Sequence, residues 1–170
     1  TDATRTTNTQ GDGLTPPDSS YGIWEATTNI VTNGGVETNT TGWVVSSKTT
    51  FARSTAQAKF GSASLLSTVT TGATGGPWSL ASFGATFTNA AYWASGWIWI
   101  PSTWTGGQIT LQTAGFSPVA TGTTSVNADM TKTDQWQRVT LGPFTPDPAD
   151  LEGNVGYFGS PFVINDYVYE

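Results

Sequence analysis

The sequence of 170 residues contains no cysteine and no histidine. Disulfides and thiol chemistry are therefore excluded, and so are zinc sites built from cysteine or histidine. The commonest general base is also missing, which removes Ser-His-Asp and Cys-His mechanisms. Carboxylate chemistry, as in the paired acids of a glycosidase, is the catalytic class that remains.

Charged residues make up only 11% of the chain, and the formal net charge is −6. An acidic chain does not suit nucleic acid or an anionic membrane as a partner. The sequence has no run of about 18 apolar residues that could span a membrane, and no basic segment leading into an apolar one as in a signal peptide. We therefore expect neither nucleic acid nor a membrane as a partner.

The twelve acidic residues all lie within 2–37 or 129–170, so the middle of the chain has none. A catalytic pair would have to come from the two ends of the chain, for example Glu37 with Asp166. Most of the other acids lie in turn-like or proline-rich contexts, where a solvated surface role is expected. We predict a protein that is not an enzyme and has no catalytic residues.

Helix formers are few, and no long apolar pattern follows the helical period. Threonine, β-branched residues and 12% aromatic residues favour strands. Strand-like segments occur at 23–24, 29–31, 43–45, 49–53, 64–69, 78–87, 92–100, 108–113, 135–141, 155–158 and 162–169. Turn residues separate them, and Gly142-Pro143 is expected to be such a turn. The pattern predicts an all-β antiparallel sandwich or barrel in a single domain.

Residues 1–22 contain almost nothing that could be buried, and Pro16-Pro17 favours an extended backbone there. We interpret this segment as an N-terminal arm that is either disordered or ordered only against a neighbouring subunit. The folded domain is expected to span 23–170.

Residues 92–100 (YWASGWIWI) read as a strand with two unlike faces. Side chains alternate across a strand, so the even-numbered residues share one face, with a gap at Gly96. Trp93, Trp97 and Trp99 share the other face. Core packing, a flat sugar and another protein chain are the candidates for what these indoles contact.

Several short motifs resemble carbohydrate-binding modules of the family 4, 9 and 22 type. Residues 29–37 (NIVTNGGVE) followed by Gly42-Trp43 resemble the opening of these modules, and 59–65 (KFGSASL) resemble the start of a later strand. The closing residues 162–170 resemble the family's final strand. The resemblance implies a jelly-roll β-sandwich of two antiparallel sheets, with a face or cleft that binds sugar.

The resemblance also implies a ligand site. Trp78 and Phe116 fall where family members present aromatic rings to a sugar, and such rings stack on the C–H face of a pyranose. Gln108, Gln112 and Asn127 are the candidate partners for sugar hydroxyls. The alternative for Trp78 and Phe116 is a structural role at the edge of the sandwich.

Many members of these families hold a structural Ca²⁺, which prefers several oxygen ligands. The matching positions are Glu37, the backbone carbonyls near Gly35 and Ala63, and Asn165. Asp166 is the next residue, although alternation would point it to the other face. Asn165 stands where the family usually has Asp, so the site has less charge than usual. Calcium is therefore an expectation of the resemblance, and Glu37 as an ordinary surface residue is the alternative.

Residues 21–30 (YGIWEATTNI) resemble a segment of tailed-phage structural proteins that leads into sandwich domains of this type. The absence of a linker or catalytic domain in this sequence fits a free-standing virion component. We expect a capsid decoration or tail protein on the virion surface, in contact with other virion proteins, copies of itself and, as a further ligand, polysaccharide. The alternative is a secreted carbohydrate-binding module from a polysaccharide-degrading enzyme that binds β-glucan or xylan.

Within this family the indoles of 92–100 occupy a face where members more often carry Thr, Arg or Lys. A sugar cleft seldom needs three indoles from one strand without charged or amide partners between them. We therefore predict that Trp93, Trp97 and Trp99, together with Trp24, form an assembly interface.

Overall fold

The computed structural model describes residues 31, 33–45, 48–71, 77–83, 90–114, 120–122, 124–146, 153–161 and 163–169. Within these residues the strands are β1 (Trp43–Val45), β2 (Thr49–Ser54), β3 (Ser64–Val69), β4 (Pro77–Phe83), β5 (Tyr92–Trp99), β6 (Gln108–Ala114), β7 (Thr121–Gly122), β8 (Ser125–Asn127), β9 (Trp136–Thr145), β10 (Gly153–Ser160) and β11 (Tyr167–Tyr169). No helix long and apolar enough to cross a membrane is found in this described part of the chain.

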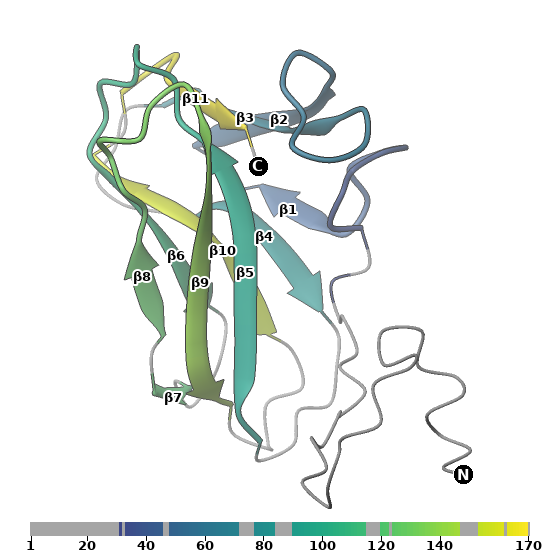
Figure 1. The fold of residues 1–170 in the computed structure, drawn as a ribbon, viewed down its shortest axis with the longest axis vertical. Helices are drawn as coiled ribbons and strands as arrows, with labels where there is room; N and C mark the ends of the chain where they lie inside the picture. Colours follow the sequence, from purple (N-terminus) through teal and green to yellow (C-terminus); the bar gives the residue numbers. More distant parts are fainter. Residues whose placement is uncertain are drawn as a thin grey trace, which may run out of the picture.

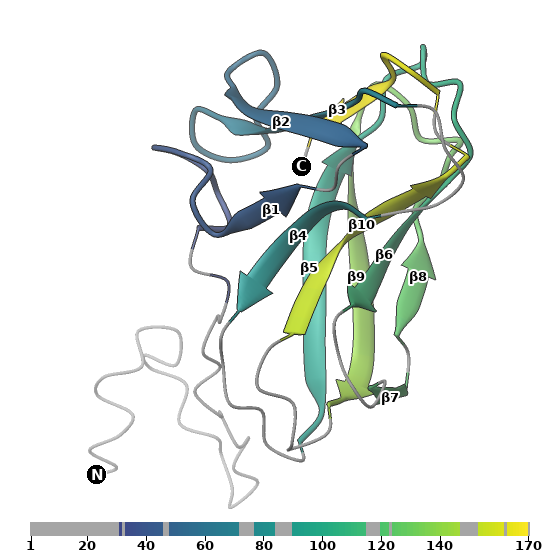
Figure 2. The same cartoon turned by 180° about the vertical axis from the view of Figure 1, so that it is seen from behind.

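The strands form two antiparallel sheets packed face to face (Figures 1 and 2). One sheet has five strands in the order β1-β4-β10-β6-β8, and the other has six in the order β2-β3-β11-β5-β9-β7. Neighbouring strands are mostly far apart in sequence, which is the connectivity of a jelly roll. The predicted fold class, an all-β jelly-roll sandwich, is therefore confirmed.

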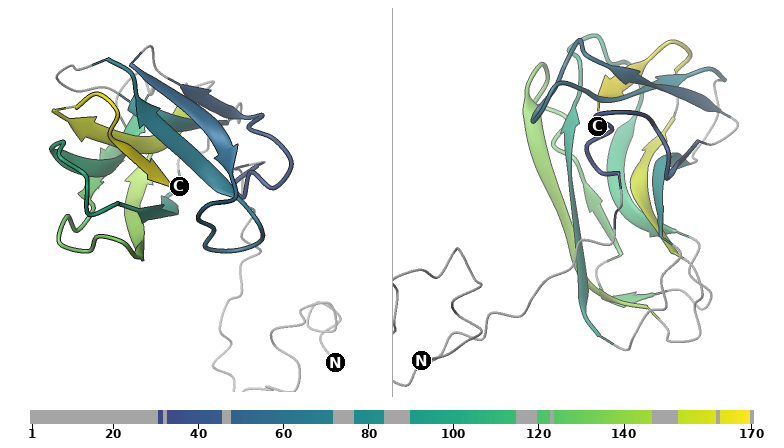
Figure 3. Two further views of the ribbon diagram at one scale, coloured as in Figure 1. Left: turned by 90° about the horizontal axis from the view of Figure 1, so that it is seen from above. Right: turned by 90° about the vertical axis from the view of Figure 1, so that its right-hand side faces the viewer.

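The short strand β11 joins two parts of the six-stranded sheet. Tyr167 and Tyr169 pair with Thr68 and Leu66 of β3, while Tyr169 also pairs with Trp99 of β5. The β2–β3 hairpin thereby lies across one end of the long β5–β9 pair, as the end-on and side views show (Figure 3).

Apolar side chains from both sheets form the core between them. Ile98 and Leu141 face inward from the six-stranded sheet, and Ile109 and Leu111 face inward from the five-stranded sheet. All four are almost fully buried. Tyr92 and Ala94 pack against this core, so the predicted inward face of the 92–100 strand is confirmed.

Gly96 in the middle of β5 leaves room for a side chain from the opposite sheet. A Cβ atom placed at Gly96 would lie 2.9 Å from the hydroxyl oxygen of Tyr157, which comes from β10 and is 3% exposed. The gap expected at Gly96 is therefore filled by Tyr157.

Several expectations about strands were wrong. Gly142-Pro143 is not a turn, because β9 continues through it to Thr145 with a cis peptide bond at that position. The pairing with β5 shifts by one residue here, so Gly142 and Pro143 both lie opposite Trp93 in a β-bulge. The short strands β7 and β8 were not expected, and the last strand is shorter than predicted.

The expected strands at 23–24 and 29–31 lie largely outside the described residues, as do the arm 1–22 and Trp24. The predicted division between an arm and a domain of 23–170 therefore stays a prediction.

Candidate functional site

The outer face of the five-stranded sheet carries a group of polar side chains, here called the polar face. Because Leu111 of β6 points into the core, its neighbours Thr110 and Gln112 point outward. Asn127 and Ser125 of β8 pair with these two residues and share their face. Gly156 of β10 lies on the other side of Gln112, in the central strand of the sheet.

The hydrogen bonds on the polar face leave donors and acceptors available. The Thr110 hydroxyl donates to the Asn127 side-chain oxygen over 2.9 Å, which leaves the Asn127 NH₂ group to donate elsewhere. Among the described residues, no hydrogen bond engages the Gln112 amide, which is half-buried. Both amides can therefore donate to and accept from a ligand.

Gln108 differs from its neighbours on β6. Its side-chain NH₂ donates to the backbone carbonyls of Ile109 and Ala128, each over 2.8 Å. These bonds hold the ends of β6 and β8 together and use both donors of the amide. In the structure, the side chain of Gln108, which was predicted to bind sugar hydroxyls, thus stabilises the sheet instead.

The structure describes only part of the two aromatic residues predicted to stack on sugar, Trp78 and Phe116. Trp78 lies in β4, which belongs to the same five-stranded sheet as Gln112 and Asn127. Its side chain and the whole of Phe116 lie outside what the structure describes. The sheet nevertheless brings four of the five predicted ligand positions, Trp78, Gln108, Gln112 and Asn127, into one layer.

The tryptophans of β5 lie on the opposite side of the sandwich. Trp93 is 65% exposed on the outer face of the six-stranded sheet, and Trp97 and Trp99 are half-buried there. Trp136 of β9 pairs with Trp99 and extends the same face. The amides of Gln112 and Asn127 and the three tryptophans of β5 therefore belong to the outer faces of different sheets.

Sequence reasoning missed the cations on this second surface. Lys59 lies with its ammonium nitrogen 4.2 Å from the ring centre of Trp97, and Arg138 donates to the Ser95 hydroxyl over 2.9 Å. Arg138 comes from β9 and Lys59 from the β2–β3 loop, so the sequence of β5 by itself contains no signal for either residue.

Glu37 is held by the loop that precedes β3. Its carboxylate accepts hydrogen bonds from the backbone N–H of Ser62 over 3.0 Å and from the Ser62 hydroxyl over 2.8 Å. These two bonds, more than the nearby Arg53, hold the pKa of Glu37 below its ordinary value. Glu37 lies close over Gly61, whose positive φ of 65° and missing Cβ make room for the carboxylate.

Asp166 lies at the other end of β3. Its carboxylate accepts from the backbone N–H groups of Thr105 and Gly106, over 3.0 and 2.7 Å, and its carbonyl accepts from the N–H of Val69. Ser62 and Val69 are seven residues apart along an extended segment, a length of about 23 Å. Glu37 and Asp166 are therefore too far apart to act as the catalytic pair considered above.

The predicted calcium ligands fall into two groups for the same reason. Gly35 and Ala63 lie near Glu37, whereas Asn165 lies beside Asp166. A calcium ion holds its ligands within about 2.6 Å, so one ion cannot take both groups. The carboxylate of Glu37 is also already bonded to Ser62. Within the described residues, no three or more acidic, histidine or cysteine side chains gather as a metal site would require. The five residues do not fit a single site, and calcium stays an untested prediction.

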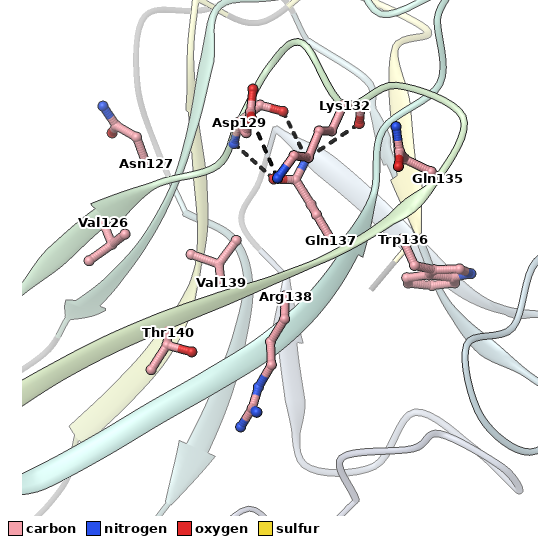
Figure 4. Close-up of a pocket in the computed structure, with 10 residues that line it drawn as sticks. All are labelled: Val126, Asn127, Asp129, Lys132, Gln135, Trp136, Gln137, Arg138, Val139 and Thr140. Carbon is pink, nitrogen blue, oxygen red and sulfur yellow. Dashed lines mark hydrogen bonds and ion pairs between the residues drawn. The ribbon is translucent and has the colours of Figure 1, made fainter.

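A cleft of about 390 Å³ lies between the edges of the two sheets, beside β8 and β9 (Figure 4). Gln137 lies in it and is 7% exposed. Its side-chain oxygen accepts from the N–H of Asp129 over 2.8 Å, and its NH₂ group donates to the Asp129 carbonyl over 2.9 Å. Asn127 and Trp136 point away from each other in Figure 4. The cleft is thus mainly the place where Gln137 anchors the loop before β9.

No protein-family model matches the sequence, and no curated protein matches it in sequence. Several solved structures match it in fold. An arabinose-bound GH51 α-L-arabinofuranosidase matches with a TM-score of 0.60 and 14% identity, over 82% of this chain and 25% of that one. The module TmCBM61, solved with β-1,4-galactotriose, matches with a TM-score of 0.58 and 13% identity, over 84% of this chain and 94% of that one.

A tailspike protein of bacteriophage CBA120 is a further match, with a TM-score of 0.56 and 14% identity. That match covers 83% of this chain, which spans only 20% of the tailspike chain. A xylan-binding domain of family 22 also matches. The fold is therefore that of a carbohydrate-binding module, as the sequence motifs predicted. The same fold occurs within an α-L-arabinofuranosidase and within a phage tailspike.

Proposed function

We propose that this protein is a non-catalytic carbohydrate-binding module that holds a polysaccharide chain across its polar face. The observation that carries the proposal is the gathering of Thr110, Gln112 and Asn127 on one sheet face, in the same sheet as the strand that contains Trp78.

The chemistry of this face suits neutral sugars. Amide and hydroxyl groups match sugar hydroxyls, since both sides donate and accept. Neighbouring strands are about 4.8 Å apart, so β6 and β8 present two parallel rows of such groups. No acidic side chain lies on the described part of this face, and Glu37 and Asp166 are at opposite ends of β3. Binding without hydrolysis is the function that these features support.

The test is isothermal titration of the full chain with soluble xylan, β-glucan and galactan. Trp78→Ala should remove a stacking contact of about 1–3 kcal/mol, which is roughly a 5- to 150-fold loss of affinity. Gln112→Ala should lose about 0.5–1.5 kcal/mol, roughly 2- to 12-fold. Gln135→Ala is the matched control, because Gln135 is an exposed amide that does not belong to the five-stranded sheet. The proposal fails if no polysaccharide binds, or if both variants bind as the unchanged protein does.

A virion component is the second candidate, as a capsid decoration or tail protein that uses this module on the virion surface. The segment 21–30 and the fold shared with a phage tailspike support it. Purification from the natural source should then recover the protein attached to capsids or tails. Recovery from the medium as part of a polysaccharide-degrading enzyme would favour the secreted alternative. Contacts with other virion proteins or with copies of itself through Trp93, Trp97 and Trp99 stay predictions.

A further inference from the structure

The outer face of the six-stranded sheet combines indoles with positive charge. We call this surface the aromatic face, and its members are Lys59, Phe60, Trp93, Ser95, Trp97, Trp99, Trp136 and Arg138. Phe60 is 67% exposed and meets Trp97 edge-on, with 5.8 Å between the ring centres. The surface therefore runs from the long strands β5 and β9 onto the β2–β3 loop.

The two cations lie among the indoles. Lys59 lies over the ring of Trp97, a cation–π contact. Arg138 is the cross-strand neighbour of Trp97, and its bond to Ser95 brings the guanidinium alongside the residue midway between Trp93 and Trp97. Trp93 and Trp97 are four residues apart on one strand, about 13 Å. Along β5, the indole of Trp93 is thus followed by the guanidinium of Arg138 and then by the indole of Trp97, with the ammonium of Lys59 over its ring.

Among the residues that the structure describes, these two cations have no acidic partner, although the chain carries a net charge of −6. Lys132 pairs with Asp129 over 3.6 Å, and Arg53 bonds to the backbone of Glu37. For Lys59 and Arg138, by contrast, no carboxylate lies within 4.0 Å among the described residues. The six strands of this sheet contain no Asp or Glu. Within the described residues, the aromatic face therefore carries two cations and no carboxylate.

A neutral ligand covering this face would replace the water around two charges with uncharged groups only, which offsets the lost hydration less well than carboxylates do. A second copy docking symmetrically would be worse, because a two-fold contact brings the same patch of each copy together and would place four cations close to one another. A ligand for this face should therefore stack on indole rings and also neutralise two cations. A ligand with both sugar rings and carboxylates can do both. Its rings stack on the exposed indole of Trp93, and its carboxylates bond to Arg138 and Lys59.

We infer that the aromatic face binds an acidic polysaccharide, one that carries uronic acid residues. This site is separate from the polar face and goes beyond the function proposed for it. A sugar site built on the indoles of β5 needs charged or amide partners between them, and β5 itself contains none. In the folded protein Lys59 and Arg138 supply these charged partners. For that reason the inference favours a glycan over the assembly contact predicted for Trp93, Trp97 and Trp99.

The test is titration of the full chain with polygalacturonate and with its fully methyl-esterified form, which has the same backbone without the charge. We expect polygalacturonate to bind at least tenfold more tightly than the ester, and its affinity to fall as salt is raised. The double variant Lys59→Gln/Arg138→Gln should lose at least tenfold in affinity for polygalacturonate. Lys132→Gln, which removes a cation that is already paired with Asp129, should bind as the unchanged protein does. Equal melting temperatures will show that the variants are folded.

Three results would overturn the inference. The first is equal binding of the acidic and the esterified polymer. The second is full affinity for polygalacturonate in the double variant. The third is self-association of the protein that Trp97→Ala abolishes, which would show that this face contacts another copy. Gln112→Ala separates the two proposals, because it should weaken neutral polysaccharides and leave polygalacturonate binding unchanged. Loss of one activity without the other therefore identifies which proposal has failed.

Discussion

The substitution Gly96→Ala tests how closely the two sheets approach each other. The new methyl group would lie 2.9 Å from the Tyr157 hydroxyl oxygen and 3.3 Å from a ring carbon of the same residue. Tyr157 is 3% exposed and comes from the opposite sheet, so the ring has little room to move. Overpacking of this kind costs about 1–3 kcal/mol. Alanine also restricts the unfolded chain, which returns about 0.4–1 kcal/mol.

The net destabilisation should therefore be about 1–2 kcal/mol. For a chain of this length, 1 kcal/mol lowers the melting temperature by about 2–4 °C, so we expect a decrease of about 2–8 °C. Thermal unfolding followed by near-ultraviolet circular dichroism measures it, with urea unfolding as a second measure of the free energy. Gly34→Ala is the control, because its new methyl group would meet only Val31 at an ordinary 3.7 Å.

The Tyr157→Phe background identifies the cause. Removing the hydroxyl removes the closest contact, so Gly96→Ala should cost less in that background than in the unchanged protein. The reasoning is refuted if Gly96→Ala melts at the same temperature as the unchanged protein. It is also refuted if the cost is the same with Phe at position 157.

The remaining predictions concern two anchoring side chains. The pKa of Glu37 is lowered from its ordinary value of 4.5 by the Ser62 hydrogen bonds, so its contribution to stability is present above that pH and is lost as the pH falls through the folded-state pKa. Glu37→Gln should consequently be less stable than the unchanged protein at neutral pH and should approach it in acid; urea unfolding across this range checks the trend, and a difference that stays constant with pH contradicts it. Gln137→Ala removes both hydrogen bonds to the Asp129 backbone at a buried position and should lower the free energy of unfolding by about 1–3 kcal/mol. Gln135→Ala, next to it in the sequence but exposed, should change it by less than about 0.5 kcal/mol, and equal effects of the two variants would show that the anchor is unimportant.

Local sequence was a good guide to the regular strands. The strands 43–45 and 64–69 were predicted with their observed bounds, and the inward and outward faces of 92–100 followed from alternation. These features depend on side-chain period and turn residues within a few positions. The β-bulge at Gly142-Pro143 could not be recognised in this way, because Gly and Pro are the usual signals of a turn. Their role in β9 depends on pairing with Trp93, about fifty residues earlier in the chain.

The candidate site shows the same division. Gln112 and Asn127 were named from the sequence and do share a face, since their strands are neighbours in the sheet. Gln108 was also predicted as a partner for sugar hydroxyls, yet its side-chain amide donates to backbone carbonyls at the ends of β6 and β8. Alternation predicts which side of the sheet a residue occupies, but not which groups lie within hydrogen-bonding distance of it.

By itself, the sequence determined that this is an all-β sandwich or barrel without thiol or histidine chemistry, and that three of its tryptophans share one face of a strand. Composition and the two-residue period are sufficient for those conclusions. Only the tertiary structure decided that Lys59 and Arg138 lie among those tryptophans, and that Glu37 and Asp166 are separated by the length of β3. Both results depend on the register and order of strands that are distant in sequence, which the alternation within any single strand does not specify.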